Sequence, residues 1–497
     1  MDYPVHTSFV AVYLLVLIGV GAMKAAKIKT QEDFSLAGRG LGFTVLVGTL
    51  LATWIGTGSI FGNAQKTYQI GMSAFLIPIS GAAGIVALYY LAQRIRNFGQ
   101  FTIQDILEAR FGLLARVLAT VALLGAYVII VSYQYRSGAA VLERLMPDLS
   151  STMAIIYVAI FVILYTALAG MFSVAYTDVA NGIMMIIGVS CAIPILLNAT
   201  GGWSAAVAAV ETHGLSGADA ATDATSVTSY WDAVKLLGIL LPAFLLMLGD
   251  ANMYQRFFSA KDAGTAKRSA IGMFVGVLFL ECAIIMVAFL ASALVSQGKL
   301  SAPENSGHII IHAAFNVMPT FLGAMLVATA VAIVVSTADS YLLAPATSVV
   351  RDIYQRFINP NAADMKIVHM SRICVLVLGV IALGLAFTSD EFFGVALFSY
   401  TIYGCAITPA MLAAFFWKRA TGAGASASII TGGGVAVLWE CSKTFAADGV
   451  GWATWMVDTF GIGSYEHVLA ALPLSVIALV GVSLIGKPPT AEQANAI

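Results

Sequence analysis

Residues 53–63 of the chain read Thr53-Trp54-Ile55-Gly56-Thr57-Gly58-Ser59-Ile60-Phe61-Gly62-Asn63. This stretch lies inside an apolar segment, 41–67, that is long enough to cross a membrane. Its three glycines disfavour a continuous helix, because glycine in a helix is about 1 kcal/mol less favourable than alanine. Lipid tolerates irregular backbone only where that backbone faces protein or a water-filled cavity. The stretch therefore predicts a helix that breaks inside the membrane and faces a binding site.

An alternative interpretation is that these glycines form a tight helix-packing surface. Gly58 and Gly62 have the Gly-x-x-x-Gly spacing that brings two membrane helices together. A second interruption favours the broken helix, since Pro242 and Gly249 stand seven apart in another apolar segment and Asp250 follows them. Paired interruptions in matching halves of a chain are typical of secondary transporters built from inverted repeats.

The composition excludes a water-soluble enzyme. The chain has 497 residues, of which 60% are hydrophobic and only 10% charged, and its mean hydropathy is +0.90. Soluble domains have about 25% charged residues. A net charge of −1 and the lack of a basic block also exclude nucleic-acid binding. The composition therefore predicts a membrane protein, not an enzyme, whose partner is the lipid bilayer, and no obligate protein partner is evident.

The apolar runs predict an all-α polytopic membrane protein that forms a single transmembrane domain, 1–497. Each predicted span approaches or exceeds the roughly 20 residues that a helix needs to cross a bilayer. From the position of the interruptions, we expect residues 41–198 and 234–417 to form two inverted repeats of five spans each. The thirteen predicted spans are 8–23, 41–67, 70–92, 114–135, 152–169, 174–198, 234–251, 270–295, 319–349, 367–388, 391–417, 424–442 and 468–486.

The lysines and arginines predict the orientation of these spans. Cytoplasmic loops of membrane proteins are enriched in both residue types. With thirteen spans, nineteen of these residues fall in loops on one side and four on the other, while Lys66 and Lys235 fall within or at the start of spans and have no assigned role. The pattern predicts a multi-pass protein of the cell membrane with its N-terminus outside and its C-terminus in the cytoplasm.

Polar residues inside the spans are the candidate functional groups, because a carboxylate at mid-bilayer costs roughly 2.5–3.5 kcal/mol. Asp178 opens the span 174–198, where it either serves a binding site or caps the helix. Ser336, Thr337 and Ser340 share one helix face in the span 319–349, so they either bind a cation or hydrogen-bond to nearby carbonyls. Glu281 and Glu440 have no evident partner.

Several short segments form a pattern along nearly the whole chain. They are Phe34-Ser35-Leu36-Ala37-Gly38-Arg39, residues 102–112 (Thr102 to Gly112), Ala175-Tyr176-Thr177-Asp178, Gln255-Arg256-Phe257 with Ala260-Lys261-Asp262, Ser336-Thr337-Ala338-Asp339-Ser340 with Arg351-Asp352-Ile353-Tyr354, and Phe416-Trp417-Lys418-Arg419 ahead of Gly422-Ala423-Gly424-Ala425. In these segments and in their order, the chain resembles the sodium/solute symporters, a family that includes proline, pantothenate, sugar, iodide and choline carriers.

The resemblance implies a fold like that of the APC superfamily, with one extra helix (8–23) before the five-plus-five core and two (424–486) after it. It also implies a sodium ion as the coupling ion. Carried over by position, the implied ligands of that ion are the carbonyls of Thr53, Gly56 and Ile333 and the hydroxyls of Ser336 and Thr337. For a second sodium, the resemblance points to Asp178 and Ser340.

The chain departs from proline-type carriers at one position. Those carriers have an aspartate in the broken helix where this chain has Ile55, so an acidic group is missing there. The stretch from Trp54 to Gly58 is more similar to choline-type carriers, over too few residues to identify a solute.

We therefore expect sodium to join the span 41–67 to the span 319–349 and thereby to complete a solute pocket. The residues predicted to line this pocket are Thr57, Gly58, Ser59, Gln134 and Tyr400. Two alternatives remain open at this stage. A proton-coupled carrier would use Asp178 or Glu281 as its titrating group, and a passive channel would not accumulate solute.

Overall fold

The computed structural model describes residues 3–25, 28–215, 223–389, 392–460 and 467–494. Within these ranges the regular structure is helical, apart from one isolated β-bridge between Leu41 and Ala260. Ten of the described helices are long and apolar enough to cross a membrane, and one bent pair of helices would make an eleventh. The chain is therefore a multi-pass membrane protein of all-helical fold.

The stretch 53–63 breaks its span, as predicted. Helix α3 (Phe43–Trp54) ends where Ile55 leaves helical geometry, with φ −72° and ψ 95°. The chain resumes as a π-helical turn, η2 (Gly58–Gly62), followed by α4 (Asn63–Ile70) and η3 (Gly71–Leu76), and the two halves are bent by 52°. Gly58 and Gly62 also act as a packing surface. A Cβ at these positions would lie 2.9 Å from the Tyr400 hydroxyl and 3.4 Å from the Phe393 ring.

The second interruption is also a break. Helix α10 (Ala233–Gly249) and helix α11 (Ala251–Ser259) are separated by Asp250, whose φ of −64° and ψ of 114° are not helical. The two broken spans meet where α3 begins and α11 ends. There the Leu41 amide donates to the Ser259 carbonyl at 3.1 Å, and the Lys261 amide donates to the Leu41 carbonyl at 3.0 Å.

Helix α8 (Ser151–Thr200) runs through the two predicted spans 152–169 and 174–198. Its 50 residues would extend about 75 Å as a straight helix, more than twice the ~30 Å thickness of the hydrocarbon core. The helix is broken at Gly170, where φ is 59° and ψ is 172°. This break falls in the predicted gap between the two spans.

Most of the remaining long helices overlap the predicted spans, but the helix of the predicted span 70–92 begins only at Pro78, and that of the predicted span 114–135 continues to Leu145. The predicted span 391–417 begins at position 391, which lies outside the described residues. These helices are α1 (Pro4–Ala25), α5 (Pro78–Phe98), α7 (Leu113–Leu145), α12 (Ala263–Ser296), α14 (Thr320–Ser348) continued by η5 (Val349–Ile358), α15 (Asp364–Leu385), α16 (Phe393–Phe416), α17 (Gly422–Ala447) and α19 (His467–Ile485). Shorter helices connect them: α2 (Gln31–Leu36), η1 (Ala37–Arg39), α6 (Ile103–Phe111), α9 (Trp203–His213), η4 (Ser306–His308), α13 (Ile309–Asn316), α18 (Gly451–Phe460) and α20 (Ala491–Ala494).

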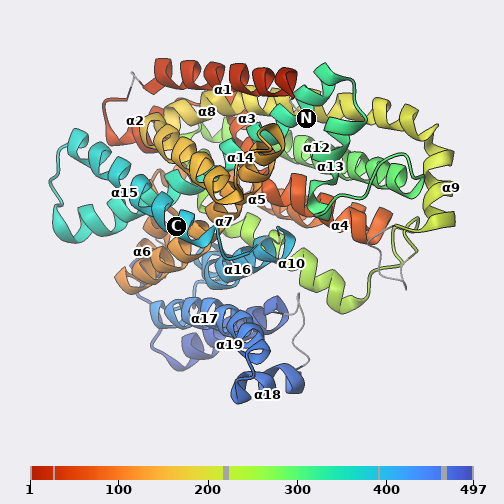
Figure 1. Cartoon of the computed structure of the whole chain (residues 1–497). Helices are drawn as coiled ribbons and strands as arrows, with labels where there is room; N and C mark the ends of the chain where they lie inside the picture. Colours follow the sequence, from red (N-terminus) through yellow and green to blue (C-terminus); the bar gives the residue numbers. More distant parts are fainter. Residues whose placement is uncertain (1–2, 26–27, 216–222, 390–391, 461–466, 495–497) are drawn as a thin grey trace.

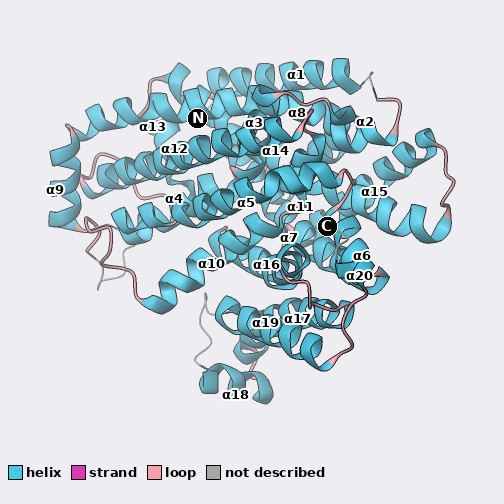
Figure 2. Ribbon diagram, turned by 180° about the vertical axis from the view of Figure 1, so that it is seen from behind, coloured by secondary structure: helices cyan, strands magenta, loops and turns pink. Residues whose placement is uncertain are grey.

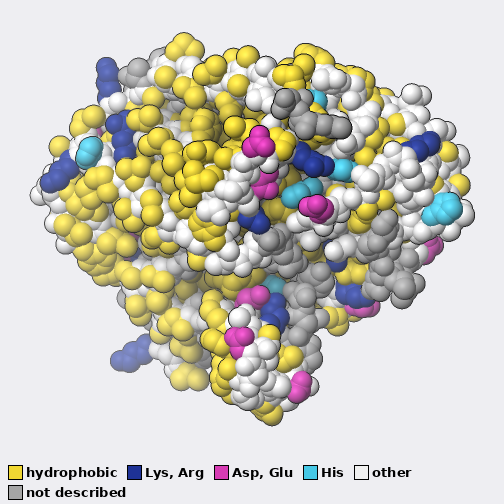
Figure 3. Space-filling view, in the orientation of Figure 1, with side chains coloured by type: hydrophobic (Ala, Val, Ile, Leu, Met, Phe, Trp, Pro, Cys, Tyr) yellow, Lys and Arg dark blue, Asp and Glu magenta, His cyan; other side chains and the backbone are white. Residues whose placement is uncertain are grey.

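Helix α14 is the central element of the bundle, and it is buried along most of its length. It packs against α7, α8 and α1, and it contacts α3 (Figures 1 and 2). Helices α17 and α19 pack against each other at the edge of the bundle, beside α16. Hydrophobic side chains cover much of the surface between the two ends of the molecule (Figure 3), as expected of helices that face lipid.

An ion-pair network ties together elements at the end of the molecule that carries most of the basic loops. The guanidinium of Arg116 on α7 bonds to Asp105 on α6 at 2.8 Å and to Asp352 on η5 at 2.5 Å. Glu108 on α6 bonds to both Arg116 and Arg356. These contacts hold α6, α7 and η5 together at that end.

The conformation of Gly170 leads to a first prediction. Its positive φ strains any L-residue, and a Cβ there would lie 2.8 Å from the Phe34 ring. We therefore expect Gly170→Ala to lower the free energy of unfolding by about 2 kcal/mol or more. The matched control is Gly125→Ala on α7, where no atom lies within 4 Å of the added Cβ. Thermal unfolding of the purified protein in detergent measures both variants, and equal melting temperatures would contradict the prediction.

Candidate functional site

Two hydroxyls of α14 lie against the broken end of α3. The Ser336 hydroxyl is 3.0 Å from the carbonyl of Ala52 and 3.2 Å from that of Ile333. The Thr337 hydroxyl is 3.2 Å from the carbonyl of Ile55 and 3.4 Å from that of Ala52. Ser336 is fully buried, and Thr337 is only 3% exposed. Five oxygens from two helices therefore converge in one buried place, which we call the α3–α14 oxygen cluster.

The structure brings Ile333, Ser336 and Thr337 together in this cluster, but no hydrogen bond of these two hydroxyls reaches the other two implied ligands, Thr53 and Gly56. The α3 carbonyls in the cluster belong to Ala52 and Ile55, each one residue before the predicted Thr53 and Gly56. The Gly56 carbonyl points toward the following turn of the chain, where it accepts hydrogen bonds from the backbone amides of Ser59 at 2.9 Å and Ile60 at 3.1 Å. The side-chain hydroxyl of Thr53 donates to the Thr49 carbonyl, one turn earlier in α3, and lies 3.2 Å from the Ser340 hydroxyl.

Asp178 and Ser340, the residues implied for a second sodium, both lie against the same nitrogen of a buried arginine. The guanidinium of Arg256 on α11 is 2.5 Å from the Ser340 hydroxyl and 3.8 Å from the Asp178 carboxylate. The Thr49 hydroxyl donates to the same carboxylate at 2.6 Å. Asp178 and Arg256 are both fully buried. The positive charge of Arg256 therefore already contacts both residues.

Asp250, at the break between α10 and α11, joins three helices through its hydrogen bonds, a role that the sequence analysis did not predict. Its carboxylate accepts hydrogen bonds from the hydroxyls of Tyr127 at 2.7 Å and Tyr341 at 2.8 Å and from the backbone amide of Asn252 at 2.6 Å. The residue thereby caps α11 and joins it to α7 and α14. The sequence did carry a signal for this role, because Asp250 is an acid at an interruption of an apolar span.

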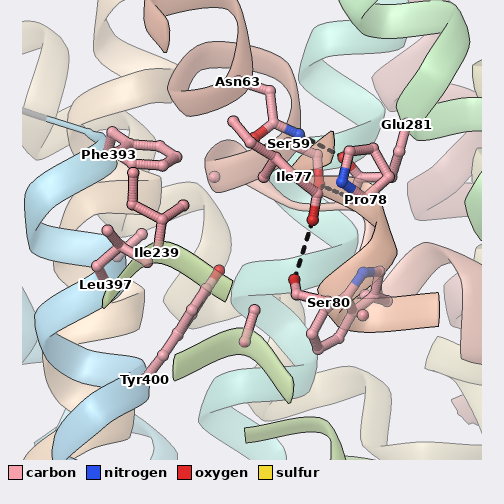
Figure 4. A pocket seen from close by; sticks show the side chains of 15 residues that line it. Ser59, Asn63, Ile77, Pro78, Ser80, Ile239, Glu281, Phe393, Leu397 and Tyr400 are labelled. Atoms are coloured by element: carbon pink, nitrogen blue, oxygen red, sulfur yellow. Dashed lines mark hydrogen bonds between the residues drawn. The ribbon is translucent and has the colours of Figure 1, made fainter. Parts of the chain in front are cut away.

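A narrow cavity of about 50 Å³ opens beside the broken span (Figure 4). Of the residues predicted to bind solute, Gly58, Ser59 and Tyr400 line it. Thr57 and Gln134 lie beside the cavity and bond to each other, since the Thr57 hydroxyl donates to the Gln134 side-chain carbonyl at 2.5 Å. The rest of the wall comes from the broken span and from the segments of α5, α10, α12 and α16, namely Trp54 and Asn63, Ile77 just before α5, Pro78, Ser80, Gly81, Ile239, Ala243, Glu281, Phe393, Ala396 and Leu397.

Glu281 on α12 has partners that sequence reasoning did not find. The Ser59 hydroxyl donates to one carboxylate oxygen at 2.7 Å, and the Asn63 amide donates to the other. Both partners come from the broken span, more than 200 residues away along the chain. Lys66, the other unassigned charge of that span, is buried with its ammonium 4.8 Å from the centre of the Tyr230 ring.

Glu440 has a different role from Glu281. It is partly exposed on α17 and forms an ion pair with Lys443, one turn further along the same helix. The structure therefore separates the two unassigned glutamates into one that lines a cavity and one on the outside of the bundle.

The chain is similar to known transport proteins over most of its length. A model of the sodium:solute symporter family matches residues 34–432. The high affinity choline transporter 1 of Homo sapiens is 27% identical, with 86% of this chain and 75% of the relative covered. The high-affinity proline transporter PutP of Bacillus subtilis is 26% identical (86% and 89% covered), and the sodium/pantothenate symporter of Escherichia coli is 26% identical (85% and 87% covered).

Solved structures show similarity of fold. The outward-open, substrate-bound structure of a Na⁺-coupled sialic acid symporter matches with a TM-score of 0.82 at 18% identity, covering 98% of this chain and all of that one. The closed conformation of Mhp1, a nucleobase-cation-symport-1 family transporter, matches with a TM-score of 0.58 at 12% identity, covering 93% and 97% of the two chains.

The hydrogen bonds to Asp250 lead to a second prediction. Tyr341→Phe removes one hydroxyl donor from a buried carboxylate, and hydrogen bonds to charged groups contribute about 1.5–3 kcal/mol. We expect the free energy of unfolding to fall by about that amount. The control is Tyr90→Phe on α5, whose side chain is exposed. Thermal unfolding in detergent again gives the comparison, and a Tyr341→Phe variant as stable as the control would show that Asp250 does not depend on this bond.

Proposed function

The chain belongs to the sodium:solute symporter family and is a sodium-coupled solute symporter, and we propose that it carries a small organic solute into the cell by alternating access. The observation that carries the proposal is the α3–α14 oxygen cluster. Alkali cations are hard ions that prefer oxygen ligands. Helix breaks that expose backbone carbonyls are a recurrent way for transporters to bind them.

We propose that the sodium ion binds in this cluster. Its ligands would be the carbonyls of Ala52, Ile55 and Ile333 and the hydroxyls of Ser336 and Thr337. The two hydroxyls donate hydrogen bonds to the same carbonyls. An ion would replace these hydrogen bonds by accepting lone pairs from all five oxygens, which would hold α3 and α14 together.

The cluster is directly connected to the cavity. A Cβ at Gly56 would lie 2.9 Å from the Thr337 methyl group and 3.2 Å from the Gln134 side-chain nitrogen. Gln134 is in turn bonded to Thr57, and Gly58 lines the cavity. Sodium binding would therefore fix the backbone immediately before the solute pocket, for which we propose Thr57, Gly58, Ser59, Gln134 and Tyr400 as binding residues. This order of events would make solute binding depend on sodium.

We propose that one sodium ion moves with each solute. A second ion between Asp178 and Ser340 would have to share the carboxylate with the Arg256 guanidinium, which bonds to Ser340. One sodium that moves down 100 mV and a tenfold gradient releases about 3.7 kcal/mol. This energy supports roughly 500-fold accumulation of an uncharged solute.

The proposed topology has thirteen spans, with the N-terminus outside and the C-terminus in the cytoplasm of a cell-membrane protein. The uneven distribution of basic loop residues supports this orientation. The count of thirteen treats α8 as two spans joined at Gly170 and includes α5 as a span. The repeats would comprise residues 41–198 and 234–417, each opening with a broken span, with 8–23 and 424–486 outside them. The Arg116 network would then lie on the cytoplasmic side.

The ion site leads to a third prediction. In the double variant Ser336→Ala with Thr337→Ala, two of the five ligand oxygens are lost. We expect the sodium concentration for half-maximal uptake in proteoliposomes to rise at least about 100-fold, equivalent to about 2.7 kcal/mol. The control is Ser371→Ala on α15, where the buried hydroxyl bonds only one turn back, to the Ile367 carbonyl, at 3.0 Å. Unchanged sodium affinity in the double variant would contradict the ligand assignment.

The stoichiometry leads to a fourth prediction. If Arg256 excludes a second ion, the initial rate of uptake should depend on sodium concentration hyperbolically, with a Hill coefficient near 1. Radiotracer uptake at saturating solute measures this dependence. A coefficient near 2 would contradict the single-ion proposal. Accumulation that persists in sodium-free buffer at acid pH would instead favour proton coupling, and a lack of accumulation against a gradient would indicate a channel.

A further inference from the structure

The cavity beside the broken span has one charged wall residue. Among the described residues that line it, Glu281 is the only aspartate, glutamate, lysine, arginine or histidine, and the others have aromatic, aliphatic or uncharged polar side chains or are glycines. Its side chain is only 5% exposed. Figure 4 shows it reaching toward Ser59 and Asn63 on one side of the cavity, with Phe393, Leu397 and Tyr400 on the opposite side.

Ser59 and Asn63 hold this carboxylate without neutralising it. Both donate one hydrogen bond to it, which fixes its orientation. Within the described part of the chain it forms no ion pair. A buried carboxylate that lacks a positive partner is costly in a low-dielectric surrounding. The carboxylate is therefore arranged to receive a positive charge from the cavity.

The aromatic rings that line the cavity are suited to the same charge. Trp54, Phe393 and Tyr400 all line the cavity, and aromatic rings attract cations through the negative face of the ring. The ring of Phe393 already lies 5.8 Å from the Lys66 ammonium, measured to the ring centre. The Tyr400 hydroxyl is 3.3 Å from that of Tyr133 and fits over Gly58, so a small residue is needed there.

Building on the proposed function, we propose that the solute is a small organic cation whose ammonium group binds between the Glu281 carboxylate and the aromatic wall. A neutral solute would leave the carboxylate uncompensated, and an anion would be repelled by it. The present cavity of about 50 Å³ has room for a few water molecules. The half-buried Trp54 and Tyr400 are the wall residues that would move apart to admit the solute.

The test uses three probes of nearly the same shape and different charge. They are choline, its uncharged isostere 3,3-dimethylbutan-1-ol, and the anion 3,3-dimethylbutanoate, together with a series of ammonium compounds from methylammonium to tetramethylammonium. Thermal stabilisation of the purified full-length protein is titrated with each probe, with and without sodium. We expect at least one ammonium compound to bind in a sodium-dependent way, and choline to bind at least tenfold more tightly than the neutral isostere and the anion.

Two variants assign the effect to the carboxylate. Glu281→Gln keeps the size and a hydrogen-bond acceptor for Ser59, and it should abolish the preference for the cation over the neutral isostere. Glu440→Gln is the matched control on the outside of the bundle and should keep the preference. Stabilisation of Glu281→Gln by sodium alone shows that the variant is folded. If the variant does not fold, the comparison of the three probes on the unmodified protein decides whether the cavity prefers a cation.

The outcomes separate this inference from the proposed function. If sodium alone does not stabilise the unmodified protein and uptake does not require it, the proposed function fails. If sodium acts as expected but no ammonium compound binds, or the neutral isostere or the anion binds as tightly as choline, the cation inference is overturned. A Glu281→Gln variant that keeps the preference for choline also overturns it.

Discussion

The contact between the end of α3 and the hydroxyls of α14 is the constraint on which the rest of the structure depends. A helix that stops inside a membrane leaves carbonyls without amide donors, and each unsatisfied group costs several kcal/mol in lipid. Here the Ser336 and Thr337 hydroxyls donate to the carbonyls of Ala52 and Ile55. The break in α3 is therefore stable only against this face of α14, which places α14 at the centre of the bundle.

The second broken span is tied to the same place by different chemistry. Asp250 supplies the acceptor that the first turn of α11 needs, and two tyrosine hydroxyls stabilise its charge. From α11, Arg256 reaches back to Thr49 on α3 at 3.1 Å and to Ser340 on α14 at 2.5 Å. The two breaks and the central helix thus form one connected polar core within an otherwise apolar bundle. A movement of either broken span would have to rearrange hydrogen bonds of the other.

The sequence predicted the elements of this core better than their contacts. The break at 53–63 follows from glycine content, and the hydroxyl face of α14 follows from helical spacing, so both are local properties. The α3 carbonyls of the oxygen cluster belong to residues that stand one position before those implied by the resemblance. The sequence could not give this position, because the point where α3 stops depends on its packing against α14. Glu281 lacked an evident partner for a similar reason, since Ser59 and Asn63 reach it only through the fold. The contacts of Arg256 with Asp178 and Ser340 could not be predicted either, because a motif identifies the residue but does not say which side chains it meets in the fold.

The four buried carboxylates near this core differ in how their charge is compensated, and that difference separates structural groups from binding groups. Asp178 faces the guanidinium of Arg256. Asp250 is enclosed by two tyrosine hydroxyls and a backbone amide, and Asp339 accepts from the Thr166 hydroxyl at 2.7 Å. All three lie within the packed helices. Glu281 is likewise held by uncharged donors, but it lines a cavity with an aromatic wall. Its charge is thus accessible to an occupant of that cavity, and an occupant that carries the opposite charge is the one that completes the site.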